Sequence, residues 1–219
     1  MDTRWFLHLL ALPLLLTLPT THSSTWTQFR QNRQHHGFVT TSTPPPKLKI
    51  IAYHTGNYVT SSPAISSDGK TMYVGSLDRH LHAINVETGQ MIWKYKTGSS
   101  INSSPCISPD GSIIFVGSND HKLHAVDARN GEKIWEYLTE NWVWSSPTIN
   151  SAGKVVFVGS LDGKMYAINV ADGSKNFTYD TGGEIWSSPI LSNDETILYF
   201  GSLDKVSSAS FSFSSSSIA

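Results

Sequence analysis

The sequence is poor in cysteine, in net charge and in long apolar runs, and each shortage excludes a class of protein. Cys106 is the only cysteine among 219 residues, so no disulfide can form within the chain. With 16 basic and 17 acidic residues the formal net charge is −1, which excludes a polybasic nucleic-acid-binding protein. Beyond the N-terminal residues, no stretch approaches the ~20 apolar residues that a membrane-spanning helix needs. One globular domain remains.

The N-terminal residues have the pattern of a secretory signal peptide. Arg4 precedes an apolar stretch over residues 5–18, and small residues lie near Ser23, where cleavage requires them. We expect a signal peptide over residues 1–23, entry into the secretory pathway and an extracellular or lumenal protein. An uncleaved anchor is the alternative. A lead-in segment follows over residues 24–46 and ends in three prolines.

A repeat of 42 residues organises the rest of the chain. The tripeptide Ser-Ser-Pro, a Gly-Ser pair, an aspartate, an alanine and a glycine return at this step without insertion or deletion. The aspartates, for example, are Asp78, Asp120, Asp162 and Asp204. Self-similarity at this period indicates a solenoid, a propeller or an array.

The pattern of apolar and turn residues in each repeat favours a β-propeller. Short runs rich in β-branched and aromatic residues alternate with Asp-Gly turns, and no stretch has helical spacing. In the first repeat the expected strands cover residues 63–66, 71–75, 81–86 and 91–96. A repeated four-stranded antiparallel unit of about 40 residues is typical of a propeller blade. We therefore expect an all-β protein, a β-propeller built from 42-residue four-stranded antiparallel blades.

The repeats cover residues 47–205 and give about three complete blades and a partial fourth. Residues 47–56 match the outermost strand of a blade and could serve the fourth. Residues 206–219 leave the pattern as a Ser-rich tail, for which we expect disorder, with a poor edge strand as the alternative. We expect an open arc with a frayed fourth blade, stabilised by a partner or by oligomerisation through open sheet edges.

Two segments, residues 83–93 and 125–135, resemble the Ala-x-Asp-x-x-Thr-Gly-x-x-x-Trp signature of PQQ-like (quinoprotein-type) propeller repeats. Trp26, Phe29, Arg30 and Gly37 resemble the segment that precedes the first blade in that family. The resemblance implies a ring of seven or eight blades, so the chain is expected to be a truncated member. It also implies blade-docking roles for three aromatic residues, of which the last is the weakest: Trp93, Trp135 and Phe177.

Positions that recur in every repeat are expected to serve the blade, whereas positions that break the repeat are candidates for function. Large aromatic residues and carboxylates break it near the start of the innermost strands: Trp142, Trp144, Trp186, Glu140 and Glu184. Such a face suits a flat, cationic or sugar-like ligand, or a peptide. Packing of bulky loop residues between blades is the alternative.

The histidines are expected to pack rather than to bind metal. His82 and His124 are equivalent in the repeat, and Tyr166 fills that place in the third copy. Tyrosine cannot replace a zinc-binding imidazole in kind. We predict no metal, no cofactor and no catalytic residue.

Two functions remain at this stage. The first is a secreted or lumenal, non-catalytic binding module with a protein or glycan partner. The second is a fragment or isoform of a PQQ-dependent, quinoprotein dehydrogenase-like protein. The chain has too few blades to enclose a quinone, so we expect the binding module. In a eukaryotic host, Asn102 and Asn176 lie in glycosylation sequons.

Overall fold

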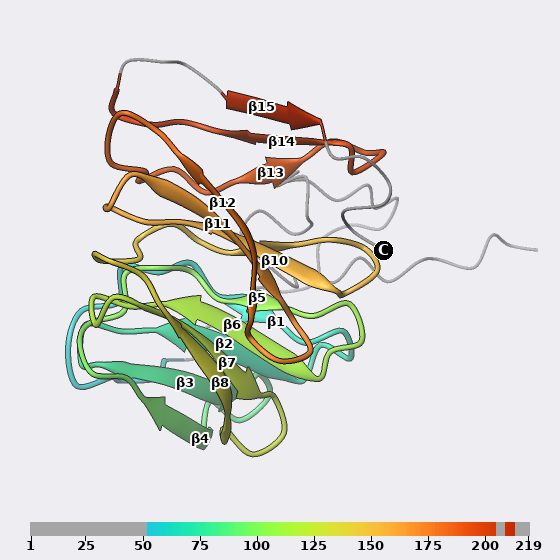
Figure 1. Cartoon of the computed structure of the whole chain (residues 1–219). Helices are drawn as coiled ribbons and strands as arrows, with labels where there is room; N and C mark the ends of the chain where they lie inside the picture. The colour runs from blue at the N-terminus through green and yellow to red at the C-terminus, as the bar shows by residue number, and fades with distance from the viewer. Residues whose placement is uncertain (1–51, 205–208, 213–219) are drawn as a thin grey trace, which may run out of the picture.

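The computed structural model describes residues 52–204 and the strand at residues 209–212. The predicted signal peptide and lead-in lie outside the described residues. Within the described part every regular element is a β-strand, and no helix there is long and apolar enough to cross a membrane. Figure 1 shows the strands grouped into small sheets that stack face to face.

Four antiparallel sheets follow one another along the chain, each in the order of its strands. Blade 1 contains β1 (Ala64–Ile65), β2 (Thr71–Gly75), β3 (His80–Asn85) and β4 (Met91–Lys96). Blade 2 contains β5 (Cys106–Ile107), β6 (Ile113–Gly117), β7 (Lys122–Asp127) and β8 (Lys133–Leu138). Blade 3 contains β9 (Thr148–Ile149), β10 (Val155–Gly159), β11 (Lys164–Asn169) and β12 (Lys175–Asp180). Blade 4 contains β13 (Ile190–Leu191), β14 (Ile197–Phe200) and β15 (Ala209–Ser212).

The predicted fold is confirmed as an open arc of three complete blades and a partial fourth. In Figure 1, β13–β15 lie at the top of the view and β1–β4 at the bottom, with blade 3 between them. The first three sheets have four strands each and the last has three.

The Ser-rich tail differs from the expectation of disorder at four residues, because Ala209–Ser212 form β15 beside β14. The pairing is one residue out of step with the repeat. In blade 1, Thr71 pairs with Asn85. The repeat equivalents of these two residues are Ile197 and residue 211, but Ile197 pairs with Ser212 instead. Backbone hydrogen bonds do not depend on side-chain identity, so a serine-rich segment can pair with an open edge although it has lost the repeat.

Turn chemistry explains why the first hairpin of blade 1 forms. The Ser66 hydroxyl donates to the Asp68 carboxylate at 2.6 Å, and the same carboxylate accepts the Lys70 N–H at 3.0 Å. Gly69 then takes a left-handed backbone conformation, with φ +71°. Aspartate, serine and glycine are the residues that such a turn favours, so the sequence sets the register of the strands that follow.

The core lies between the blades rather than inside any one of them. Each blade offers one apolar face to the following blade and the opposite face to the preceding one. Ala64, Tyr73 and Trp93 of blade 1 form one buried cluster with Ile114 and Val126 of blade 2. Two further clusters join blade 2 to blade 3 and blade 3 to blade 4.

The repeated aspartate joins neighbouring units. In the turn between the second and third strands, one Asp78 oxygen accepts the His80 N–H at 3.0 Å. The other oxygen accepts the N–H of Gly56, in the exit turn of the preceding unit, at 2.9 Å. Equivalent inter-unit bonds of 2.8–3.0 Å recur at Asp120, Asp162 and Asp204.

We expect Asp120→Asn to destabilise the fold by about 1–3 kcal/mol at neutral pH, since the carboxylate accepts hydrogen bonds from Gly98, Lys122 and His124. Burial alone would raise the pKa of Asp120, but hydrogen bonds from His124 and Gly98 outweigh it and lower that pKa. A carboxyl whose pKa is lower in the folded state stabilises the fold above its unfolded pKa, about 4. This contribution disappears as the pH falls through the folded pKa.

Urea unfolding across the acid range tests this assignment. The difference between wild type and Asp120→Asn should be largest near neutrality and should shrink as the pH falls below about 4. Asp172→Asn, a change at a fully exposed turn aspartate, is the matched control and should leave stability nearly unchanged. A difference for Asp120→Asn that does not vary with pH would contradict the assignment.

Candidate partner-binding face

The structure brings three of the predicted aromatic residues into one cluster. The rings of Trp142 and Trp144 stack with centroids 5.6 Å apart and an interplanar angle of 21°. The rings of Trp144 and Trp186 meet edge to face, with centroids 4.7 Å apart and an interplanar angle of 77°. Trp186 comes from the next repeat, so the cluster spans the junction of two units. We call these three residues the tryptophan face.

Buried neighbours in the sequence fix the backbone that carries the tryptophan face. Val143 and Ile185 are fully buried, so the residues on either side of each must point away from the core. Val143 packs directly on Gly117, where an added Cβ would lie 2.4 Å from a Val143 methyl carbon. Glycine at that position therefore allows the loop to approach β6 closely.

Trp144 is the anchored member of the face. It is half-buried, and its indole N–H donates to the Asn119 side-chain oxygen at 2.7 Å. The Asn102 side-chain amide donates to the same oxygen at 3.2 Å. The remaining two rings are open to solvent, with Trp142 41% and Trp186 50% exposed.

Asn119 is a residue of the candidate site that was not predicted from the sequence. Its repeat equivalents are Leu77, Leu161 and Leu203, so Asn119 breaks the repeat as clearly as the tryptophans do. The signal was present in the sequence, but the partner of Asn119 lies 25 residues away along the chain.

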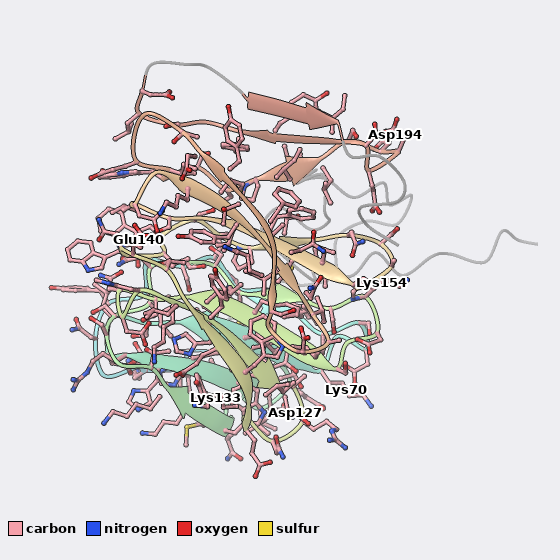
Figure 2. The ribbon with its side chains drawn as sticks, in the orientation of Figure 1. Lys70, Asp127, Lys133, Glu140, Lys154 and Asp194 are labelled. Atoms are coloured by element: carbon pink, nitrogen blue, oxygen red, sulfur yellow. The ribbon has the colours of Figure 1, made fainter. Side chains whose placement is uncertain are left out.

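The charged residues beside the face are mostly acidic. Glu184 accepts the Trp186 indole N–H at 2.8 Å. The exposed Glu140 forms an ion pair with Lys164, and the hydrogen bond to Glu140 raises the pKa of Lys164. Figure 2 shows Glu140 on the side of the molecule opposite Lys154 and Asp194. The face thus combines open aromatic surface with two carboxylates and one paired lysine.

The histidines lie in a repeated hydrogen-bonded array. His82 is buried, with Tyr53 Oη 3.0 Å from its Nδ1 and Asp78 3.0 Å from its Nε2. The second repeat has the same arrangement at His124, and Tyr166 donates to Asp162 at 2.7 Å in the third. Sequence analysis foresaw the packing role but not the hydrogen bonds.

Asp78, His80 and His82 bring ligand-type atoms within 4.8 Å of one another, a spacing that could hold a metal ion. However, both ring nitrogens of His82 already face hydrogen-bond partners, and the Asp78 carboxylate accepts two backbone N–H groups. The same Asp–His pair recurs in the next repeat with Lys122 in place of His80. The repetition favours a framework role for this cluster.

The candidate docking residues lie between blades. Trp93 donates its indole N–H to the Ala128 carbonyl of the next blade at 3.1 Å, and its ring covers Gly131. Trp135 donates its indole N–H to the Val170 carbonyl of blade 3 at 2.8 Å, and its ring covers Gly173. Phe177 is half-buried and packs against the cluster between blades 3 and 4.

These features define a β-propeller with PQQ-like blades. A family model described as outer membrane protein assembly factor BamB matches residues 19–176 and 107–211. Because these matches cover most of the chain, the chain belongs to this PQQ-like repeat family.

The crystal structure of BamB from Moraxella catarrhalis superposes with a TM-score of 0.60 at 22% identity, over 72% of this chain. The chain spans 50% of that BamB chain. Comparison with curated proteins found no match.

Proposed function

We propose that this chain is a non-catalytic binding module that holds a partner protein against the tryptophan face. One observation carries the proposal: tryptophans from two repeats gather at one place, yet Trp142 and Trp186 stay about half exposed. Residues that served packing alone would be covered, as Trp93 and Trp135 are. Clustered tryptophans are the side chains that most often dominate the energy of a protein interface.

The chemistry of the face favours a partner segment that presents lysine or arginine beside apolar side chains. A cation can lie over the open indole faces, which attract it through their negative quadrupole. Glu140 and Glu184 add favourable charge at the edge of the face. BamB is described as an outer membrane protein assembly factor, and this description also suits a role in holding protein partners.

We place the mature chain in the secretory pathway, on the strength of the N-terminal signal pattern.

PQQ itself does not suit the tryptophan face. This cofactor is a flat quinone that carries carboxylates, so it needs an open aromatic slot and cationic partners. Here Trp142 and Trp144 stack on each other, and Lys164 is paired with Glu140. Quinone absorbance retained through gel filtration, after incubation with quinone and calcium, would instead support the dehydrogenase alternative.

A fluorescence titration tests the proposed face. A cationic peptide containing arginine and leucine should change the tryptophan fluorescence saturably, and added salt should weaken its binding. Trp186→Ala should weaken binding at least about tenfold, the effect of losing roughly 1.4 kcal/mol. Ile134→Ala, at an exposed apolar residue of β8, is the matched control and should bind as wild type does. A response to a neutral oligosaccharide alone would indicate a glycan partner, and no response to any probe would contradict the proposal.

The two sequons give a separate test of the secretory assignment. Asn176 is exposed, and its side-chain amide donates to the Asn169 oxygen at 2.8 Å. Asn102 is half-buried, and its amide donates to Asn119 near the tryptophan face. In a eukaryotic secretory host we expect a glycan at Asn176. Enzymatic removal of N-glycans should lower the mass of wild type and of Asn102→Gln, but not that of Asn176→Gln. A chain that keeps Met1 and carries no glycan would contradict the assignment.

A further inference from the structure

The two ends of the arc are structurally incomplete in complementary ways. Blade 4 has three strands and no fourth within the described residues. At the other end, Tyr53 meets His82 of blade 1 at 3.0 Å, as Tyr95 of β4 meets His124 of blade 2 at 3.0 Å. Likewise, the Gly56 N–H donates to the Asp78 carboxylate, as the Gly98 N–H donates to the Asp120 carboxylate. Residues 53–56 therefore stand where the fourth strand of a preceding blade would end.

The end faces of the arc leave positions open that are closed between blades. In the first three repeats one position of the second strand is almost fully buried, at Tyr73 (4% exposed), Phe115 (0%) and Phe157 (0%). Its equivalent in blade 4, Tyr199, is 40% exposed. On the outward face of blade 1, Ile65 and Met72 are half-buried, whereas their equivalents in blades 2 to 4 are buried: Ile107, Ile149, Leu191, Ile114, Val156 and Leu198.

We propose that a second copy of this chain packs against these end faces, blade 4 of one copy against blade 1 of the other. The repeat itself specifies this occupant, because the face that blade 4 leaves open is the face that each preceding blade packs on its successor. Tyr73 hydroxyl donates to the Ala128 carbonyl at 3.3 Å, and the equivalent pair in the proposed junction is Tyr199 with Val86 of the second copy. Residues 53–56 of that copy would then lie beside β15 and supply the missing fourth strand.

A ring of two copies contains two identical junctions, since each copy offers one end of each kind. A head-to-tail contact that closes after two copies gives a ring with a twofold axis. The ring buries both open faces and pairs both open sheet edges, which otherwise favour aggregation.

Light scattering during size-exclusion chromatography of the full chain tests the proposal. Wild type should have the mass of two chains over a wide range of concentration. Tyr199→Glu places a charge in the junction and should reduce the mass to one chain, while circular dichroism stays that of a β-protein because Tyr199 is exposed in the arc. Ile134→Glu introduces the same charge on the exposed side of β8 and should keep the mass of two chains.

A charge-pair rescue identifies the residues that meet. Val86→Lys alone should also give the mass of one chain, and the double variant Tyr199→Glu with Val86→Lys should recover the mass of two, because the opposite charges would lie together across the junction. A wild-type mass of one chain would overturn the proposal and would show that the chain covers its own end faces. Masses that grow without limit, or a double variant that stays at one chain, would overturn it as well.

Discussion

Replacing Trp135 by alanine is expected to lower the free energy of unfolding by about 3–5 kcal/mol, the usual cost of removing a large buried aromatic side chain. The indole is only 8% exposed, and it fills the space between blades 2 and 3. Its N–H also donates to the Val170 carbonyl at 2.8 Å, so the substitution leaves a buried acceptor without that donor. Urea denaturation of the purified variant gives the measurement.

The other docking positions give the internal comparison. Trp93→Ala should cost a similar amount, because Trp93 makes the same hydrogen bond to Ala128 and is 9% exposed. Phe177→Ala should cost least, since Phe177 is half-buried and its ring has no N–H to donate. Small and equal losses at all three positions would show that these side chains do not hold the blades together.

The second large effect is expected for Gly131→Ala. Gly131 has φ +75°, and an added Cβ would lie 2.6 Å from a ring carbon of Trp93. The backbone conformation alone should cost about 1–2 kcal/mol with alanine. Forcing Trp93 from its place should add about 1–3 kcal/mol, the range for overpacked cores.

Gly69→Ala separates these two contributions. Gly69 has nearly the same backbone conformation, with φ +71°, but an added Cβ would meet nothing within 4 Å. The difference between the two variants in urea denaturation therefore measures the contact with Trp93. Equal losses of stability for Gly131→Ala and Gly69→Ala would mean that the ring moves aside freely, in contradiction to the docking role.

The architecture was predictable from the sequence because the repeats have closely similar strand and turn residues at the same positions. Asp68 and Gly69 specify a turn, and the apolar residues between turns specify buried strands, so a constant step of 42 residues fixes the blade. The departure from the pattern after Lys205 likewise predicted a defective fourth blade. The register of β15 could not be predicted, because it depends on the open edge of β14 and not on the serines themselves.

The tryptophans of the candidate site were predictable from the sequence, but Asn119 and the geometry were not. Broken repeat symmetry identified Trp142, Trp144 and Trp186. The anchoring of Trp144 by Asn119, and the hydrogen bond from Gly56 to Asp78, join residues that are more than 20 positions apart along the chain. Such pairings follow from how neighbouring units stack, which local patterns do not encode.

We propose that the tryptophans covered between blades build the fold, whereas those of the tryptophan face serve a partner. Urea denaturation of Trp186→Ala beside Trp135→Ala tests it most directly, because the same substitution is made in both places. We predict that Trp186→Ala loses no more than about 1.5 kcal/mol, the worth of one aromatic contact with Trp144. Trp135→Ala should lose at least about twice that amount. Equal, large losses would show that the tryptophan face serves packing rather than a partner.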